Sequence, residues 1–338
     1  MPSGTRVASA TTSDPFQLRR RSLAPCLILC ALLSLPSASS AASKLPSLSR
    51  TLEECAKFGR RVKTCRGEFR IDSRLFREVQ DGRMPPTTTT GSWEMSGSGL
   101  REETTRTYPA LAAGTSTAQS SRGGRRSGSR TAPATPPHGE ERRVVVFDGA
   151  TCRVQEYKGG VRQADRVETG GDAAQVAAGH CEFWKYLGIT PPGVRSGAQG
   201  LCPVDDGSGS LEMLGVESLD GVDCLKLRSR AHAGDREVLW WVAPAYGYLV
   251  MRKDEIRYFE PGQELKQGQY TLVRIRVTEV ERFPSSAYLP TRVQKSAVWM
   301  NSDGSIARQL RRWTFTASDM TVNDSAGTRV YSAAQPAG

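Results

Sequence analysis

Residues 211–318 constrain the fold more than any other part of the chain. They form a succession of short segments in which apolar residues alternate with polar ones, separated by turn dipeptides such as Asp220-Gly221. Alternation with a period of two residues is typical of β-strands with one buried face. Because the connections are short, neighbouring strands must run antiparallel. The pattern therefore predicts a long up-and-down meander.

The apolar residues change parity at two places along this meander. The odd-numbered Ile275 and Val277 are followed by Val280, and the even-numbered Leu310 is followed by Trp313. A shift of one residue moves side chains to the other face, so a bulge or bend is expected near 280 and near 311. We expect about eleven strands, more than a typical sheet of 4–6. The predicted fold class is mainly β (α+β), a large curved antiparallel meander that forms a half-barrel.

Two segments, 49–63 and 172–187, carry apolar residues at helical spacing. Pro191 and Pro192 follow the second segment and end it. The strand around Leu239–Val242 is apolar on both faces, and such strands are covered on both faces. We therefore expect the helices to pack on or over the concave face of the half-barrel.

The N-terminus has the features of an export signal. Arg19, Arg20 and Arg21 precede an apolar run, 23–35, which is followed by small residues. The run is shorter than the roughly 20 residues that span a bilayer, so cleavage after Ala41 is favoured over a retained membrane anchor. The expected location is periplasmic or otherwise exported. The organisation is then a signal peptide, 1–41, and a single half-barrel domain, 42–338.

Residues 110–141 interrupt the strand pattern with a segment rich in Ala, Gly, Ser and Arg. Such a composition does not bury enough apolar surface to offset an ordering cost of about 1–2 kcal/mol per residue. We interpret it as a disordered insertion. The segment is either a solvated linker or a region whose arginines contact an anionic surface. No aromatic residues separate them, so a specific nucleic-acid partner is not expected.

The cysteines and histidines bear on whether the chain has a chemical site. Outside the N-terminal segment, six of the eight cysteines remain, an even number that permits disulfides in an exported protein. The favoured pair is Cys202 with Cys224, and the alternative is that the cysteines are buried thiols. The adjacent residues His180 and Cys181 are the polar pair that most suggests a chemical site. Neighbouring residues of a helix point in different directions, however, and this pair lacks the spacing of metal ligands. We expect no metal and no cofactor.

No motif of a catalytic nucleophile, phosphate-binding loop or metalloprotease occurs in the sequence. We therefore expect a protein that is not an enzyme. The six tryptophans lie in predicted helices or strands and serve either as core or, in part, as the lining of an apolar cavity. The residues expected to line such a cavity are Trp184, Trp240, Trp241, Tyr248 and Trp299.

Four short motifs resemble the LolA/LolB-like superfamily of periplasmic lipoprotein carriers, in an uncharacterised branch. They are Val145-Val-Phe-Asp-Gly149, Ser218-Leu-Asp-Gly-Val-Asp-Cys224, Leu239-Trp-Trp-Val-Ala-Pro-Ala-Tyr-Gly-Tyr-Leu-Val-Met251 and Tyr288-Leu-Pro-Thr-Arg292. The resemblance covers roughly residues 50–322 apart from the insertion, and it implies a half-barrel with a helical lid over a hydrophobic cavity. Ala243 and Val250 depart from it, because Asp and Pro are usual at these positions.

Two functions of different class follow. The first is an exported envelope protein, a carrier or sensor, that binds an apolar ligand or a lipid or lipoprotein acyl chain in the cavity. The alternative is a scaffold of the cell envelope with a self-filled core, whose partner is another envelope protein. The chain is expected to be a monomer in either case.

Overall fold

The structure is a computed structural model, and it describes residues 45–76, 86–97, 99–108, 139–188, 209–258 and 268–323. The predicted signal peptide and Cys202 lie outside these ranges. So does the predicted insertion, 110–141, apart from its last three residues. Of these, Glu140 and Glu141 begin strand β4, where they lie opposite Thr107 and Arg106. No helix in the described ranges has the length and apolar character needed to cross a membrane.

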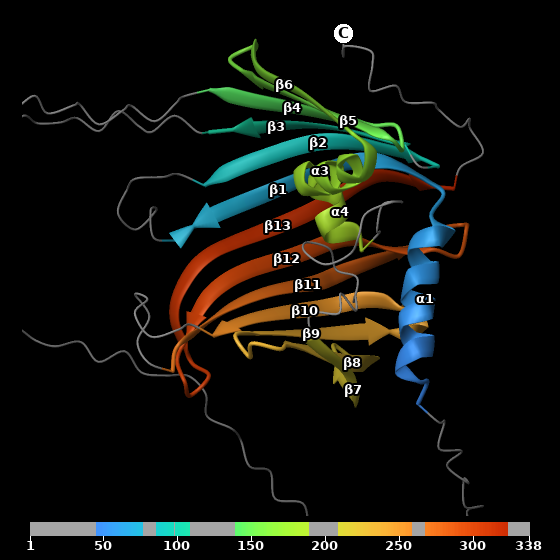
Figure 1. Ribbon diagram of the computed structural model, residues 1–338, viewed down its shortest axis with the longest axis vertical. Helices are drawn as coiled ribbons and strands as arrows, with labels where there is room; N and C mark the ends of the chain where they lie inside the picture. The colour runs from blue at the N-terminus through green and yellow to red at the C-terminus, as the bar shows by residue number, and fades with distance from the viewer. Residues whose placement is uncertain are drawn as a thin grey trace, which may run out of the picture. The chain divides into compact units, whose positions relative to one another are not determined.

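All strands of the described residues belong to one antiparallel sheet of 13 strands (Figure 1). The order across the sheet is β6-β5-β4-β3-β2-β1-β13-β12-β11-β10-β9-β8-β7, so the first and last strands in sequence, β1 and β13, pair in the middle. The strand bounds are β1 Thr64–Leu75, β2 Thr87–Ser96, β3 Gly99–Thr107, β4 Glu140–Phe147, β5 Thr151–Lys158, β6 Val161–Thr169, β7 Gly209–Leu219, β8 Val222–Ala231, β9 Arg236–Ala243, β10 Leu249–Tyr258, β11 Tyr270–Arg282, β12 Tyr288–Met300 and β13 Ile306–Val322.

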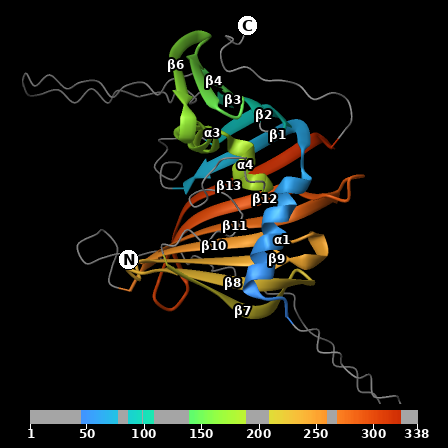
Figure 2. The same cartoon turned by 45° about the vertical axis from the view of Figure 1, so that its right-hand side comes forward.

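The sheet is curved and open, as the sequence predicts (Figures 1 and 2). The register between β11 and β12 is irregular from Val277 to Val280, and that between β12 and β13 is irregular beside Arg311. Both parity shifts read from the sequence are therefore confirmed as bulges or irregularities of the ladder. Such irregularities bend and twist a strand, which is what a long curved sheet requires.

Strand β6, Val161–Thr169, was not expected. Nearly all of its residues are exposed, and it has no buried face that would impose alternation on the sequence. It pairs with β5 at one edge of the sheet, where charged side chains protect the open backbone from further pairing. Burial alternation, the main signal by which strands are recognised, is absent here, and only the preceding Gly159-Gly160 turn marks the strand in the sequence.

The predicted helix 172–187 is two helices. Helix α3, Ala173–His180, ends at Cys181, whose backbone is extended, and helix α4, Glu182–Leu187, begins directly afterwards. Helix α1, Leu48–Arg61, agrees with the predicted segment within two residues, and short 3-10 turns, η1 and η2, cover Gly170–Asp172 and Pro244–Tyr246. Helix α3 packs on β4 and β5, and α4 packs on β12, so both cover the concave face (Figure 2).

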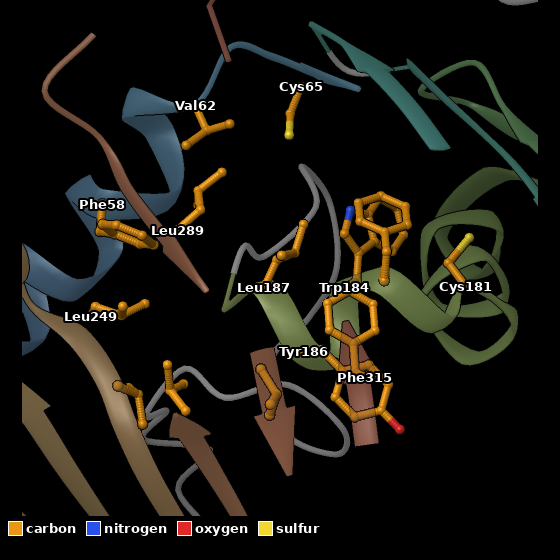
Figure 3. Close-up of a cluster of buried hydrophobic side chains, with 14 of the residues drawn as sticks. Phe58, Val62, Cys65, Cys181, Trp184, Tyr186, Leu187, Leu249, Leu289 and Phe315 are labelled. Carbon is orange, nitrogen blue, oxygen red and sulfur yellow. The ribbon is translucent and has the colours of Figure 1, made fainter. Parts of the chain in front are cut away.

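An aromatic cluster fills part of the concave face. Phe183 of α4 stacks on Trp93 of β2 with ring centroids 5.5 Å apart, and Tyr186 stacks on Phe315 of β13 at 4.8 Å. Figure 3 shows Tyr186 over Phe315, and Leu187 between these rings and the side chains of α1. Offset aromatic pairs add about 0.5–1.5 kcal/mol each beyond the area they bury. The helices are therefore integral to the core.

Gly91 of β2 is a point of close approach beneath this cluster. A Cβ atom added there would lie 2.5 Å from the carbonyl oxygen of Glu103 and 2.7 Å from the ring of Phe69. We predict that Gly91→Ala lowers the free energy of unfolding by about 1–3 kcal/mol, because backbone and a packed ring must both move. Urea denaturation measures the change.

Gly179→Ala is the matched control. Gly179 lies in α3 with no atom within 4 Å of an added Cβ, so alanine there should leave stability unchanged or raise it by up to about 1 kcal/mol. Equal urea midpoints for Gly91→Ala and the wild type would show that a methyl group fits at Gly91 beside the ring of Phe69.

Candidate binding pocket on the concave face

One row of directly opposed residues crosses the middle of the sheet on its concave face. Lys253 of β10 lies opposite Ile275 of β11, Ile275 lies opposite Lys295 of β12, and Lys295 lies opposite Trp313 of β13. Directly opposed residues of antiparallel strands point to the same side. The row therefore presents two ammonium groups with an aliphatic side chain between them.

A second row one step along the strands adds to the same surface. Glu255 of β10 lies opposite Val273 of β11, and Arg257 is two residues further on the same face. Helix α4 forms the opposite wall through Glu182, Lys185 and Tyr186. These two rows and the helix enclose a pocket of about 360 Å³, within the range of small-ligand sites. Its described lining is Glu182, Lys185, Tyr186, Lys253, Glu255, Arg257, Val273, Ile275, Lys295 and Trp313.

The two carboxylates of the pocket are each shared by two cations. Glu182 lies 3.3 Å from the Lys185 ammonium and 3.4 Å from the guanidinium of Arg143. Glu255 lies 2.7 Å from Arg257 and 3.3 Å from Arg236. Burial raises the pKa of Glu255, but these arginines outweigh it and hold the pKa below its ordinary value. Both groups are therefore carboxylates at neutral pH, and cations still outnumber them.

Lys295 has no hydrogen-bond or ion-pair partner among the residues that the structure describes. Its ammonium lies 5.0 Å from the centre of the Trp313 ring, a cation–π contact. Burial, and then the charge of Lys185, lower the pKa of Lys295 from its ordinary value near 10.5. Lys253 is more deeply placed, with only 6% of its surface exposed. The pocket therefore holds two cations in a site of reduced solvation.

The buried Glu102 of β3 sets the position of α4. Its carboxylate oxygens accept hydrogen bonds from the backbone N–H groups of Glu182 and Phe183, each at 3.0 Å. These are two of the N–H groups that have no partner within a helix, and negative charge is favoured at this end. Burial nevertheless raises the pKa of Glu102 to about 7. Glu102 therefore fixes the helix that forms one wall of the pocket.

The five residues predicted to line a cavity lie in different parts of the fold. Trp184 is buried on α4, and Trp240 of β9 is buried directly opposite Lys253, at the margin of the pocket. Trp241 is on the other face of the sheet, beneath the guanidinium of Arg252 at 4.2 Å. None of the five is in the pocket's described lining, and as ligand contacts they stay predictions.

Tyr248 and Trp299 are the other two. Tyr248 follows η2 with a positive φ of 70°, and its carbonyl accepts a hydrogen bond from the Cys55 thiol. Trp299 of β12 is half-buried, with the guanidinium of Arg308 over its ring. For the predicted disulfide, Cys224 is buried in the core, and Cys202 is outside the described residues, so the pairing is untested.

The lining residues themselves were not predicted from the sequence. One signal exists for Lys295, which has the same parity as the buried Val293 of its strand. Parity gives no such signal for Lys253, because a register shift between Val250 and Arg252 separates it from the apolar start of β10. A lysine at a core-facing position is uncommon unless it is paired or functional. Among the described residues, no group of His, Cys, Asp and Glu has the arrangement of a metal site.

No protein-family model and no curated protein matches the chain. Solved structures that it resembles include a DUF1329 family protein from Desulfovibrio piger, 10% identical, with a TM-score of 0.40. A LolA superfamily protein from Nitrosomonas europaea is 12% identical, with a TM-score of 0.37. Each match covers 82% of this chain and 94% of the other. A LolA superfamily protein is thus among the solved structures that the chain resembles in fold. At these TM-scores it carries no argument about ligand or activity.

Replacing Glu102 by Gln removes the buried group that titrates near neutral pH. Between about pH 4.5, the ordinary value, and about 7, the folded state binds more protons than the unfolded state. Stability contributed by Glu102 is therefore greatest at low pH and falls as the pH rises through this window. We predict that the free energy of unfolding of the wild type, relative to Glu102→Gln, falls by about 2 kcal/mol from pH 5 to pH 8.

Urea denaturation of both proteins across this pH range gives the comparison. Other carboxylates contribute equally to the two proteins and cancel in the difference. Two stability curves that run parallel from pH 5 to pH 8 would show that Glu102 keeps an ordinary pKa, because the hydrogen bonds from α4 then offset the burial of its charge.

Proposed function

We propose that the protein is a non-catalytic carrier or sensor that binds an amphiphilic ligand, such as a lipid or an acylated protein, in the pocket on its concave face. We propose further that it acts outside the cytoplasm, as the N-terminal sequence favours. The observation that carries the binding proposal is the composition of the pocket. Val273, Ile275, Tyr186 and Trp313 supply apolar surface, and charged side chains surround it.

This composition favours an amphiphile over a wholly apolar ligand. Fully apolar cavities of a carrier would be lined by side chains such as those of the aromatic cluster, but Phe183, Trp184 and Leu187 are already packed in the core. The pocket instead adjoins ammonium, guanidinium and carboxylate groups. A ligand must offer polar atoms to these groups, because burying a charged group without a partner is costly.

The self-filled core supports a second candidate, a scaffold without a small ligand. Side chains from α1, α4 and the sheet form one continuous hydrophobic cluster. If the pocket served only to keep charged groups hydrated, water and salt would occupy it and no lipid would bind. The two candidates therefore make opposite predictions for ligand binding.

Trp313 provides a probe within the pocket itself. We predict that a brominated fatty acid quenches the tryptophan fluorescence of the wild-type protein in a saturable manner, because bromine quenches an indole that it contacts. The ligand-dependent loss should be strongly reduced in Trp313→Phe. It should persist in Trp299→Phe, which changes a tryptophan of the adjacent strand outside the described lining.

Native mass spectrometry of protein purified from envelope fractions provides an independent measurement. Absence of saturable quenching, together with absence of any co-purifying amphiphile, would overturn the carrier or sensor proposal and favour the scaffold.

A further inference from the structure

We infer that the pocket selects the ligand by an anionic head group, a carboxylate or a phosphate, held between Lys253 and Lys295. This inference rests on the proposed function, since it names the chemical class of the ligand in the same pocket. It is carried by the placement of the two lysines, by the charges around them and by the lack of an acidic partner for Lys295.

The placement suits a single small anion. Lys253 and Lys295 lie on β10 and β12, both directly opposite Ile275 of the intervening strand. Neighbouring strands are about 4.8 Å apart, so the two backbones are separated by about 10 Å. Flexible lysine side chains that rise from the same face at this separation can approach one anion from two sides. Ile275 lies between them, where the first carbons of an attached chain would rest.

The surrounding charges leave this position positive. Each pocket carboxylate, Glu182 and Glu255, already has two basic partners, one of them an arginine outside the pocket lining. Arg143 and Arg236 therefore neutralise part of the negative charge of Glu182 and Glu255 without lining the pocket themselves. Lys253 and Lys295 are added to a set of ion pairs that is already rich in cations. An entering anion meets net positive charge, and a cationic ligand is repelled.

The state of Lys295 also favours an anion. Among the described residues its ammonium has no hydrogen-bond or ion-pair partner and lies over the face of Trp313, while Glu182 and Glu255 act on it only at longer range. Burial and then the charge of Lys185 lower its pKa, and the more distant Glu182 and Glu255 do not offset them. A carboxylate or phosphate would supply the missing partner and stabilise the charged form. Lysine acts as a point charge without the fork of arginine, so either anion would satisfy it.

Four ligands with the same alkyl chain test the inference: dodecanoate, dodecyl phosphate, dodecanol and dodecylamine. Binding to the full chain is measured by isothermal titration calorimetry below the micelle concentration of each compound. We expect one or both anions to bind at least about tenfold more tightly than the alcohol, which corresponds to about 1.4 kcal/mol. The amine should bind more weakly than the alcohol. The ratio of the two anion affinities distinguishes a carboxylate from a phosphate head group.

Lys295→Met should remove most of the anion preference and leave the affinity for dodecanol unchanged. Lys295→Arg should retain the preference, because it keeps the charge. Lys226→Met is the control, since Lys226 lies on the other face of the sheet over Trp241 and its loss changes the net charge equally. Lys226→Met should behave as the wild type does.

The outcomes separate this inference from the function on which it rests. If dodecanol binds as tightly as the anions, selection by an anionic head group is overturned. If Lys295→Met keeps the preference, the placement of the head group between Lys253 and Lys295 is overturned. In both cases the binding function stands. If none of the four compounds binds, both are overturned.

Discussion

The bond between Glu102 and the start of α4 is the interaction on which the concave face depends. A carboxylate without surface exposure accepts the N–H groups of Glu182 and Phe183 at the point where the chain leaves α3. These bonds satisfy N–H groups that have no partner within α4, directly after the break at Cys181. The break turns α4, so that Phe183 and Tyr186 reach the aromatic rings of the sheet while Glu182 and Lys185 reach the pocket. One buried acid thus places both the core and one wall of the candidate site.

The curved sheet follows from the sequence because its signals are local. Alternation, turn dipeptides and the parity shifts near 280 and 311 all lie within a few residues of the structures that they predict. The break at Cys181 does not, because Glu102, which accepts the N–H groups exposed there, lies on a distant strand. Strand β6 was missed for a different reason, since an exposed edge leaves no burial pattern in the sequence.

The pocket could not be assembled from the sequence because its residues come from four strands and a helix. Their meeting depends on the register of each strand pair, and a shift of one residue in any of them would turn a lysine to the other face. Only the shared parity of Lys295 and Val293 carried a local signal. The predicted cavity residues were aromatic, since the expected ligand was apolar, and aromatic side chains are used here mainly in the core.

The two halves of the concave face have different physical roles. Beside β1, β2 and β13 the face is closed by stacked rings, and a bound chain would have to displace packed aromatic side chains at a cost of several kcal/mol. Above β10–β12 the face keeps Lys253 and Lys295 on the inside, although apolar residues at these positions would extend the core. Replacing a buried ion pair by apolar side chains is often neutral or stabilising, so buried charge at these positions is weak evidence for a stabilising role. A protein that needed only a filled half-barrel would gain nothing from them, whereas a protein that recognises an anion requires them at this position.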